Sequence, residues 1–201
     1  MKRPLVLGLT GSIGMGKSTT AEMFGAEGVP VWNADAAVHR LYAAGGAGVR
    51  AVAALCPAAT GPDGVDRQVL NAWLQQNEVG LQRLEAAVHP LVAEDRAAFL
   101  DAAATDGAEL VVLDIPLLFE TGADRDVDAT LVVTASPEEQ RRRVLSRPGM
   151  TEATLAGLLS RQMPDAEKRD RADHVIETRS LDQTRADVRR LLQELRKSAD
   201  A

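Results

Sequence analysis

Five short runs rich in aliphatic residues recur along the chain and predict the strands of a β-sheet. They cover residues 5–9, 29–32, 110–113, 129–133 and 172–176. The first and third runs are almost continuously apolar, which is typical of parallel strands that are buried on both faces. Between the runs, apolar residues recur mainly at helical spacing. The pattern therefore predicts an α/β protein with a five-stranded parallel sheet.

Local start signals place helices around this sheet. The first helix is expected over residues 17–26, directly after the first strand. Ser136 is followed by Pro137 and Glu139, which is the residue order favoured at a helix N-terminus. Residues 180–183 form a capping box that begins the last helix. The expected core stripe of that helix comprises Leu181, Val188, Leu191, Leu192 and Leu195.

Residues 36–106 read as mostly helical, with a loop at residues 57–64. This segment is far longer than a simple crossover between strands, so we expect a helical insertion that covers the substrate. Pro90 disfavours the helical conformation in the residue before it, which predicts a break in the helix at His89. His89 either points into a cleft or is an ordinary structural histidine.

A glycine-rich stretch after the first strand carries the clearest chemistry. Residues 11–18 fit G-x-x-x-x-G-K-[ST] in all four fixed positions, between a predicted strand and a predicted helix. This arrangement places backbone N–H groups around an anion at the positive end of a helix dipole. An ordinary glycine-rich turn is the alternative, but the flanking elements favour a nucleoside triphosphate site. The residues expected to bind the nucleotide are Gly11, Ser12, Ile13, Gly14, Met15, Gly16, Lys17, Ser18 and Thr19. Lys17 is expected to reach the outer phosphates, and the Ser18 hydroxyl to bind Mg²⁺.

Two acidic residues follow predicted strands, at the edge where open α/β sheets place their chemistry. Asp35 follows the second strand and either accepts the proton of a substrate hydroxyl or caps the helix that starts at Ala36. Asp114 follows the third strand and either holds Mg²⁺, directly or through water, or caps the turn after it.

A run of arginines begins in the helix after Ser136. Arg141, Arg142 and Arg143 are consecutive, and Arg147 follows closely. Such a run is either a solvated helix face or, near a P-loop, a clamp for transferring phosphoryl oxygens. A short helix over residues 151–162 and further cations follow it, so we expect a mobile lid here.

Composition narrows the class of protein. A chain of 201 residues suits one α/β domain with insertions, and its net charge of −6 argues against a nucleic-acid-binding protein. Cys56 is the only cysteine, so an internal disulfide is impossible and a thiolate metal cluster is implausible. Neither a signal peptide nor a membrane span is evident, which leads us to expect a cytoplasmic protein. The oligomeric state stays open.

Together these motifs resemble the dephospho-CoA kinase family of the nucleoside monophosphate kinase-like fold. Residues 10–18 read T-G-S-I-G-M-G-K-S, close to the family's T-G-G-I-G-S-G-K-S. The D-x-P-L-L-F-E signature is intact at residues 114–120, and the family's His-Pro pair matches His89 and Pro90. The A-D-x-V-I ending occurs at residues 172–176. The resemblance covers nearly the whole chain.

The chain departs from the family pattern at a few positions. Ser12 and Met15 replace glycine and serine in the P-loop, which leaves the backbone cradle possible. Asn33 replaces the first acid of the family's D-A-D, so the role implied for that motif goes to Asp35. Thr178 stands where asparagine is common, which removes the expectation of a side-chain contact to adenine from this position.

The resemblance implies a P-loop NTPase three-layer fold and an ATP-dependent kinase that uses Mg²⁺. Its small-molecule substrate is dephospho-CoA, whose ribose 3′-hydroxyl is phosphorylated in the last step of coenzyme A synthesis. Asp35, Lys17 and Arg147 are then the expected catalytic residues. The expected substrate contacts are Asp35, His89 and Asp114, and the expected metal contacts are Ser18 and Asp114.

The resemblance also implies three parts of the chain. Residues 1–35, 107–140 and 172–201 form the expected core domain, residues 36–106 the CoA-binding insertion, and residues 141–171 the lid. Two other functions stay open: a P-loop kinase for shikimate, gluconate or a nucleoside monophosphate, and a nucleotide-dependent switch protein. The intact D-x-P-L-L-F-E signature disfavours the first, and the lack of an N-K-x-D motif disfavours the second.

Overall fold

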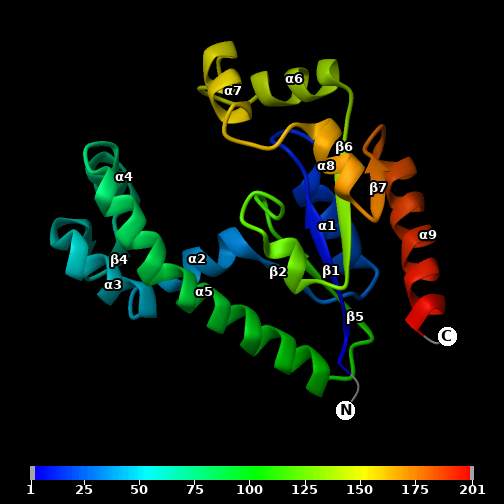
Figure 1. The fold of residues 1–201 in the computed structure, drawn as a ribbon, viewed down its shortest axis with the longest axis horizontal. Helices are drawn as coiled ribbons and strands as arrows, with labels where there is room; N and C mark the ends of the chain where they lie inside the picture. Colours follow the sequence, from blue (N-terminus) through cyan, green and yellow to red (C-terminus); the bar gives the residue numbers. More distant parts are fainter. Residues whose placement is uncertain (1–2, 200–201) are drawn as a thin grey trace. The chain divides into compact units, whose positions relative to one another are not determined.

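A computed structural model describes residues 3–199 of the chain (Figure 1). The chain forms two compact units, which divide after Trp32 and again before Ala103. The sheet unit comprises the described residues 3–32 and 103–199, and the helical unit is Asn33–Ala102.

The sheet has five strands in the order β2-β5-β1-β6-β7. Parallel pairing joins β1 to both β5 and β6, and β6 to β7. The five strands are β1 (Leu5–Thr10), β2 (Val31–Asn33), β5 (Leu110–Asp114), β6 (Ala129–Thr134) and β7 (His174–Glu177). The predicted five-stranded parallel sheet is therefore confirmed. β2 starts later than the sequence predicted because Pro30 has no N–H to donate, although its carbonyl already accepts the N–H of Val112 at 2.9 Å.

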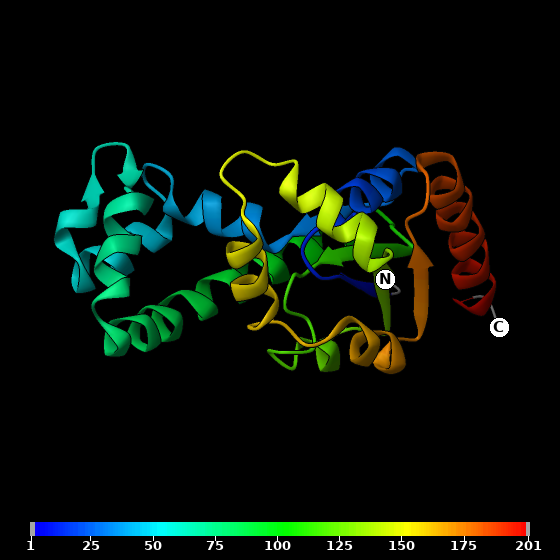
Figure 2. The ribbon, with the colours of Figure 1, turned by 90° about the horizontal axis from the view of Figure 1, so that it is seen from above.

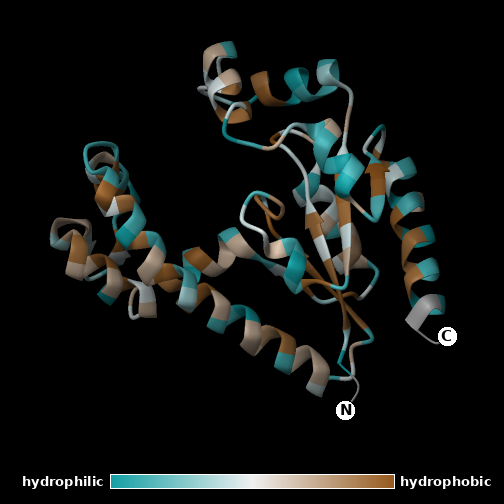
Figure 3. Cartoon of the chain, in the orientation of Figure 1, coloured by the Kyte–Doolittle hydropathy of each residue, from teal (hydrophilic) through white to brown (hydrophobic). Residues whose placement is uncertain are grey.

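Two helices, α1 (Lys17–Ala26) and α9 (Leu181–Ala199), share one hydrophobic core with the sheet. Leu9, Phe24 and Leu192 are among its buried members. A third helix, α8 (Asp165–Arg171), contacts β6, and Figure 2 shows α1 and α8 on opposite sides of the strands. The strands are mostly hydrophobic in Figure 3, in agreement with a buried sheet.

One member of the predicted core stripe of α9 is wrongly assigned. Leu181 is 62% exposed, because it is the first residue of the helix and lines the pocket described below. The buried stripe instead begins with Thr184 and continues through Val188 and the three later leucines. Ser180 caps the helix as predicted, since its hydroxyl accepts the N–H of Gln183 at 3.3 Å.

Two further helices of the sheet unit are α6 (Pro137–Leu145) and α7 (Glu152–Leu159), and a 3₁₀ turn, η2, covers Ala123–Asp126. Ser136 caps α6 as predicted. α7 is shorter than the predicted helix at residues 151–162. α8 was not predicted at all, because its sequence is almost entirely polar and lacks a helical apolar stripe.

The helical unit has its own core, in which Val52, Leu70 and Leu84 are buried. Its helices are α2 (Ala34–Tyr42), α3 (Ala47–Leu55), α4 (Arg67–Gln75) and most of α5 (Glu78–Thr105). The predicted loop at residues 57–64 contains a 3₁₀ turn, η1 (Pro57–Ala59), and continues into a hairpin of β3 (Thr60–Gly61) and β4 (Gly64–Val65).

The predicted helix break at His89 is wrong. α5 continues through Pro90, which lies inside the helix. Both residues are exposed, so water can bind the carbonyl of Ala86 that would otherwise accept an N–H of residue 90. Among the helices of residues 3–199, none is long and apolar enough to cross a membrane.

Candidate active site

The P-loop, residues 11–18, links β1 to α1 and requires its glycines. Gly14 and Gly16 have φ angles of 80° and 91°, in the left-handed region that favours glycine. A Cβ atom on Gly11 would lie 2.7 Å from the carbonyl oxygen of Val133, and one on Gly14 would lie 2.6 Å from Val144. Gly16 is also the N-cap of α1 and supplies no side-chain hydrogen bond there. The first N–H groups of α1 are therefore available to an anion.

Lys17 and Asp114 come together at the carboxyl ends of β1 and β5. Their side chains form an ion pair in which Lys17 is 14% exposed and Asp114 is completely buried. Asp114 lies opposite Leu9 in the sheet register, one residue before the end of β1. The structure thus brings together two of the residues that the sequence singled out.

The residues around Lys17 fit a magnesium ion that is bound together with a nucleotide. Ser18 lies in the exposed first turn of α1, and Asp114 supplies a carboxylate beside Lys17. Within residues 3–199, no group of three or more His, Cys, Asp or Glu side chains forms a metal cluster. Mg²⁺ commonly uses one or two protein oxygens, with phosphates and waters as its other ligands, so this donor set suits it.

The peptide groups at Ile13 are held from two sides. The carbonyl of Ile13 accepts Nε2 of Gln140 at 2.8 Å, and its N–H donates to Oε1 of Gln162 at 3.2 Å. The side chain of Met15 is buried, and its sulfur accepts the N–H of Ala135 at 3.1 Å. These contacts show that Ile13 and Met15 anchor the loop; their binding of nucleotide stays a prediction.

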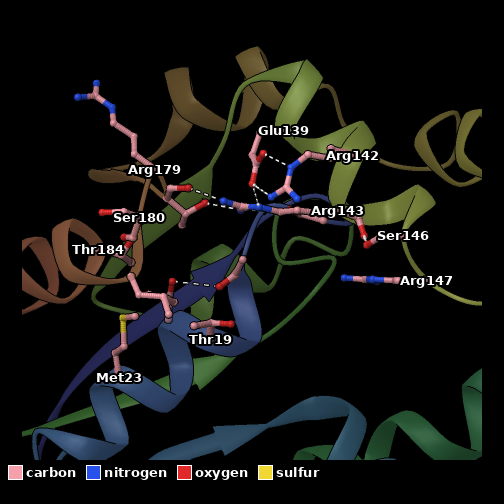
Figure 4. Close-up of a pocket in the computed structure, with 15 residues that line it drawn as sticks. Thr19, Met23, Glu139, Arg142, Arg143, Ser146, Arg147, Arg179, Ser180 and Thr184 are labelled. Atoms are coloured by element: carbon pink, nitrogen blue, oxygen red, sulfur yellow. Dashed lines mark hydrogen bonds and ion pairs between the residues drawn. The ribbon is translucent and has the colours of Figure 1, made fainter.

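A pocket of about 510 Å³ lies beside the P-loop (Figure 4). Its walls come from the P-loop and α1, from α6 with the turn after it, and from the segment that joins β7 to α9. The lining residues are Gly14, Gly16, Thr19, Thr20, Met23, Glu139, Arg142, Arg143, Ser146, Arg147, Thr178, Arg179, Ser180, Leu181 and Thr184. The sequence predicted the P-loop wall and Arg147, but not the wall after β7.

Glu139 lies between two of the arginines in Figure 4. It accepts hydrogen bonds of 2.7 Å from both Arg142 and Arg143. The bonds from Arg142 first, and then from Arg143, lower the pKa of Glu139 to about 2. Arg142 is 70% exposed and extends along the helix surface, whereas Arg143 turns toward the P-loop.

Thr178 is a site residue that sequence analysis discounted as an adenine contact and to which it assigned no other role. Its buried hydroxyl accepts Nη1 of Arg143 at 2.8 Å and lies 2.9 Å from the carbonyl of Met15, to which it donates. The Thr178 carbonyl accepts Nη2 of the same guanidinium at 2.6 Å. Thr178 therefore ties the end of β7, α6 and the P-loop together. No local pattern reveals this role, because the partners lie far apart in the sequence.

Arg147 lines the pocket from the turn after α6 and is exposed. Within the part of the chain that the structure describes, its guanidinium has no hydrogen bond or ion pair to another side chain. In Figure 4 it extends away from the network around Glu139. Of the arginines predicted as phosphate ligands, Arg147 is thus the one whose charge is available to a ligand.

Asp35 and His89 belong to the helical unit, where both are exposed. Asp35 lies in the first turn of α2. The N-cap of α2 is Asn33, whose side chain accepts the N–H of Ala36 at 2.8 Å. The alternative interpretation of Asp35 as the N-cap is therefore wrong: the helix starts two residues earlier than expected, and Asn33 takes the cap position.

The parallel sheet, the glycine loop before α1 and the Lys17–Asp114 pair define a P-loop α/β protein.

The profile of the dephospho-CoA kinase family matches residues 5–183. A dephospho-CoA kinase of Cereibacter sphaeroides is 60% identical over 99% of this chain and 100% of its own length. One of a Jannaschia species is 62% identical over 94% of this chain and 96% of its own. A crystal structure from Thermus thermophilus superposes with a TM-score of 0.77, at 36% identity, and covers 96% of this chain and 99% of that one. The chain belongs to the dephospho-CoA kinase family.

Proposed function

We propose that this protein is an ATP-dependent kinase that phosphorylates the ribose 3′-hydroxyl of dephospho-CoA. The products are coenzyme A and ADP, and the reaction is the last step of coenzyme A synthesis. The observation that carries the proposal is a complete P-loop, with Lys17 paired to a buried Asp114, in a chain that matches this family over residues 5–183. A protein with this role acts in the cytoplasm on a small-molecule substrate.

The sheet unit supplies the phosphate site in this proposal. Backbone N–H groups of residues 11–18 hold the β-phosphate, and the Lys17 ammonium bridges to the γ-phosphate. Lys17 then exchanges part of its contact with Asp114 for contact with phosphate. Ser18 and Asp114 would hold a Mg²⁺ ion that is bound with ATP, and the ion would supply neutralisation of phosphate charge there.

Asp35 is proposed to orient the acceptor hydroxyl and to take its proton. This assignment is supported by the match to the family's D-A-D motif and by the rejection of the N-cap role, which Asn33 fills. His89 and Asp114 are proposed as further contacts to the acceptor. For His89 the support is the His-Pro match in the sequence together with its exposure on α5.

Arg147 is proposed to stabilise the negative charge that develops on the transferring phosphoryl group. Its lack of a protein partner within the described residues supports this choice over Arg143, whose guanidinium is already held by Glu139 and Thr178. Residues 141–171 act as the lid that carries Arg147 in this proposal. Residues 36–106 bind the CoA part of the substrate, and residues 1–35, 107–140 and 172–201 form the catalytic core.

The decisive experiment measures ADP release in a coupled assay with and without dephospho-CoA. We expect turnover that depends on dephospho-CoA and a product phosphorylated at the ribose 3′-position, which NMR or mass spectrometry identifies. A panel of shikimate, gluconate and nucleoside monophosphates serves as the comparison. Faster turnover with one of these acceptors would overturn the substrate assignment. ATP hydrolysis that is indifferent to every acceptor would instead indicate a nucleotide-dependent switch.

A further inference from the structure

The lid segment (residues 141–171) carries Arg147 in a stretch, residues 141–161, that is flanked by two glutamines, and both glutamines contact a single residue of the P-loop. Gln140, immediately before the segment, donates to the carbonyl of Ile13 at 2.8 Å. Gln162, directly after that stretch at its far end, accepts the N–H of Ile13 at 3.2 Å. The two glutamines are 22 residues apart in the sequence, and each engages one polar group of the same P-loop residue. The position of the lid ends is therefore linked to the conformation of the P-loop.

The far end is held in place by Glu120. One carboxylate oxygen of Glu120 accepts the N–H of Met163 at 2.9 Å and lies 2.8 Å from Nζ of Lys168. Met163 directly follows Gln162, so Glu120 fixes the backbone of the lid stem (residues 161–164) one residue from the contact to Ile13. Lys168 is completely buried, and its charge requires a partner at this depth.

Glu120 has a rigid support of its own. It ends the D-x-P-L-L-F-E signature, whose Leu118 and Phe119 are buried and whose Pro116 carbonyl accepts the hydroxyl of Thr10 at 3.0 Å. On the other side, the guanidinium of Arg171 lies 4.7 Å from the ring centre of Phe119 and donates to Asp124 at 3.0 Å. The signature loop and α8 are thus joined by several contacts, and Glu120 extends from this support to the lid stem.

The charge state of Glu120 agrees with this arrangement. Burial opposes its ionisation, but the contact with Lys168 and the bonds from backbone N–H groups, first that of Met163, lower the pKa of Glu120 overall. The carboxylate is therefore ionised at neutral pH, where it pairs with Lys168 and accepts the N–H of Met163.

We propose that Glu120 is a positioning residue for phosphoryl transfer, which acts on the P-loop through the lid stem and Gln162. The proposal rests on the proposed function for its kinetic consequence. Without Glu120, the stem loses the contact that holds its backbone, and the hydrogen bond from Ile13 to Gln162 is weakened. The lid that carries Arg147 is then no longer anchored through the stem. Ground-state binding of ATP depends mainly on the P-loop amides and Lys17 and changes little. The chemical step needs a fixed geometry, so it slows.

A purely structural role for the Glu120–Lys168 pair predicts something different. In that case removal of Glu120 lowers the melting temperature and leaves kcat unchanged at temperatures where the protein is folded. Gln162, which is partly exposed and belongs to no helix or strand, would then have no kinetic role. The two cases are separable because the substitution of Gln162 does not disturb the buried pair.

The kinetic test compares Glu120→Ala, Gln162→Leu and the double variant. We expect each single variant to lower kcat by about 10- to 100-fold, the scale associated with small misplacements of catalytic groups, with the KM for ATP within about threefold. The double variant should be no slower than the slower single variant, because both break the same connection. Asp173→Asn is the control for loss of a part-buried carboxylate: Asp173 accepts the N–H and the hydroxyl of Thr130 at 2.8 Å each, away from the stem and the P-loop, and this variant should keep kcat. Wild-type kcat in Gln162→Leu, or additive losses in the double variant, would overturn the proposal.

A second readout does not depend on the acceptor. Trypsin cleavage after Arg161, in the stem, is followed by mass spectrometry in the presence of Mg²⁺ and the β,γ-imido analogue of ATP. We expect faster cleavage there in Glu120→Ala and Gln162→Leu, because cleavage requires local opening of the stem. Cleavage after Arg179, between β7 and α9, is the internal reference: acceleration at both sites equally would indicate general instability and contradict the proposal. If the wild-type protein fails to use dephospho-CoA, the proposed function fails, while this cleavage pattern still decides the role of Glu120.

Discussion

Arg142 and Arg143 are neighbours in α6, yet their surroundings differ. Within the described residues Arg142 pairs with Glu139 alone, on the helix surface, where such a pair contributes little to stability. Arg143 shares Glu139 but also binds the hydroxyl and the carbonyl of Thr178 at the end of β7. Arg147, one turn later, has neither kind of contact within the described residues. Three arginines within one short segment thus have three different roles: Arg142 is a surface charge, Arg143 a structural link and Arg147 an available cation.

This contrast leads to a prediction for Arg147. Arg147→Lys should lower kcat by at least about 10-fold, because an ammonium cannot reproduce the planar, two-pronged contact of guanidinium with phosphoryl oxygens. Arg142→Lys is the matched control and should retain near wild-type kcat. Steady-state kinetics on both variants, with circular dichroism to confirm folding, provide the comparison. Equal tolerance at the two positions would mean that Arg147 is only part of a solvated face.

Glu139 allows a prediction about pH. Its pKa in the folded protein is about 2, lowered first by Arg142 and then by Arg143, whereas glutamate in an unfolded chain titrates near ~4.3. Because the folded-state pKa is the lower one, the contribution of this carboxylate to stability is complete above ~4.3 and is lost as pH falls toward 2. We expect Glu139→Gln to lower the urea midpoint at pH 7, and the difference from wild type to shrink between roughly pH 4.5 and 3. A difference that stays constant over this range would show that the charge of Glu139 is not what stabilises the protein.

The candidate site was predictable where its chemistry is local. Lys17, Ser18 and the glycines belong to one continuous motif, whose conformation follows from its own sequence. Thr178 and Gln162 were not predictable as P-loop supports, because their contacts to Met15 and Ile13 span more than a hundred residues. A threonine and a glutamine also occur on any protein surface, so nothing in their residue type indicates the role.

At the scale of elements, the start of α2 separates the helix N-cap from the candidate proton acceptor, two roles that the sequence left open for Asp35. Asn33 caps the helix, and Asp35 occupies the first turn without capping it. Asp35→Asn should therefore change stability little, by at most the ~0.3–1 kcal/mol of a favourable helix-dipole interaction. If Asp35 accepts the acceptor's proton, kcat should fall at least ~100-fold while ATP affinity stays the same.

The control for this prediction is Asn33→Ala. It should cost about 1 kcal/mol of stability through loss of the cap, with little effect on the chemical step. Melting temperature, ATP-analogue affinity and kcat on both variants distinguish the roles. Asp35→Asn turning over dephospho-CoA at close to the wild-type rate would remove Asp35 from the mechanism.

Elements with strong periodic or capping signals were predicted well, and those decided by tertiary context were not. The Ser136 and Ser180 caps occur as expected because an N-cap needs only its own first turn. α8 was missed because its polar sequence gains its stability from the buried Lys168 and its contact with Glu120. Conversely, Pro90 suggested a break in α5 that does not occur, since the exposed face of a long helix tolerates the lost hydrogen bond.

At the scale of the whole molecule, each of the two units has its own hydrophobic core. The sheet unit's core is built on the strands with α1 and α9, and the helical unit's core on residues such as Val52, Leu70 and Leu84. One tryptophan lies in each unit: Trp32 in β2 and Trp73 in α4. The chain has no other tryptophan, so fluorescence can report on each unit in single-tryptophan variants.

Leu70→Ala should therefore weaken the helical unit selectively. Leu70 is almost fully buried, and truncation of such a leucine costs about 2–5 kcal/mol. We expect the urea midpoint reported by Trp73, in a Trp32→Phe background, to fall further than the midpoint reported by Trp32 in a Trp73→Phe background. The affinity for an ATP analogue should persist at low urea, because the P-loop belongs to the sheet unit, while the KM for dephospho-CoA should rise.

α5 runs from one unit into the other, and a fully cooperative molecule would transmit the damage through it. Identical shifts of both midpoints, with parallel loss of nucleotide binding, would show that the two cores unfold as one.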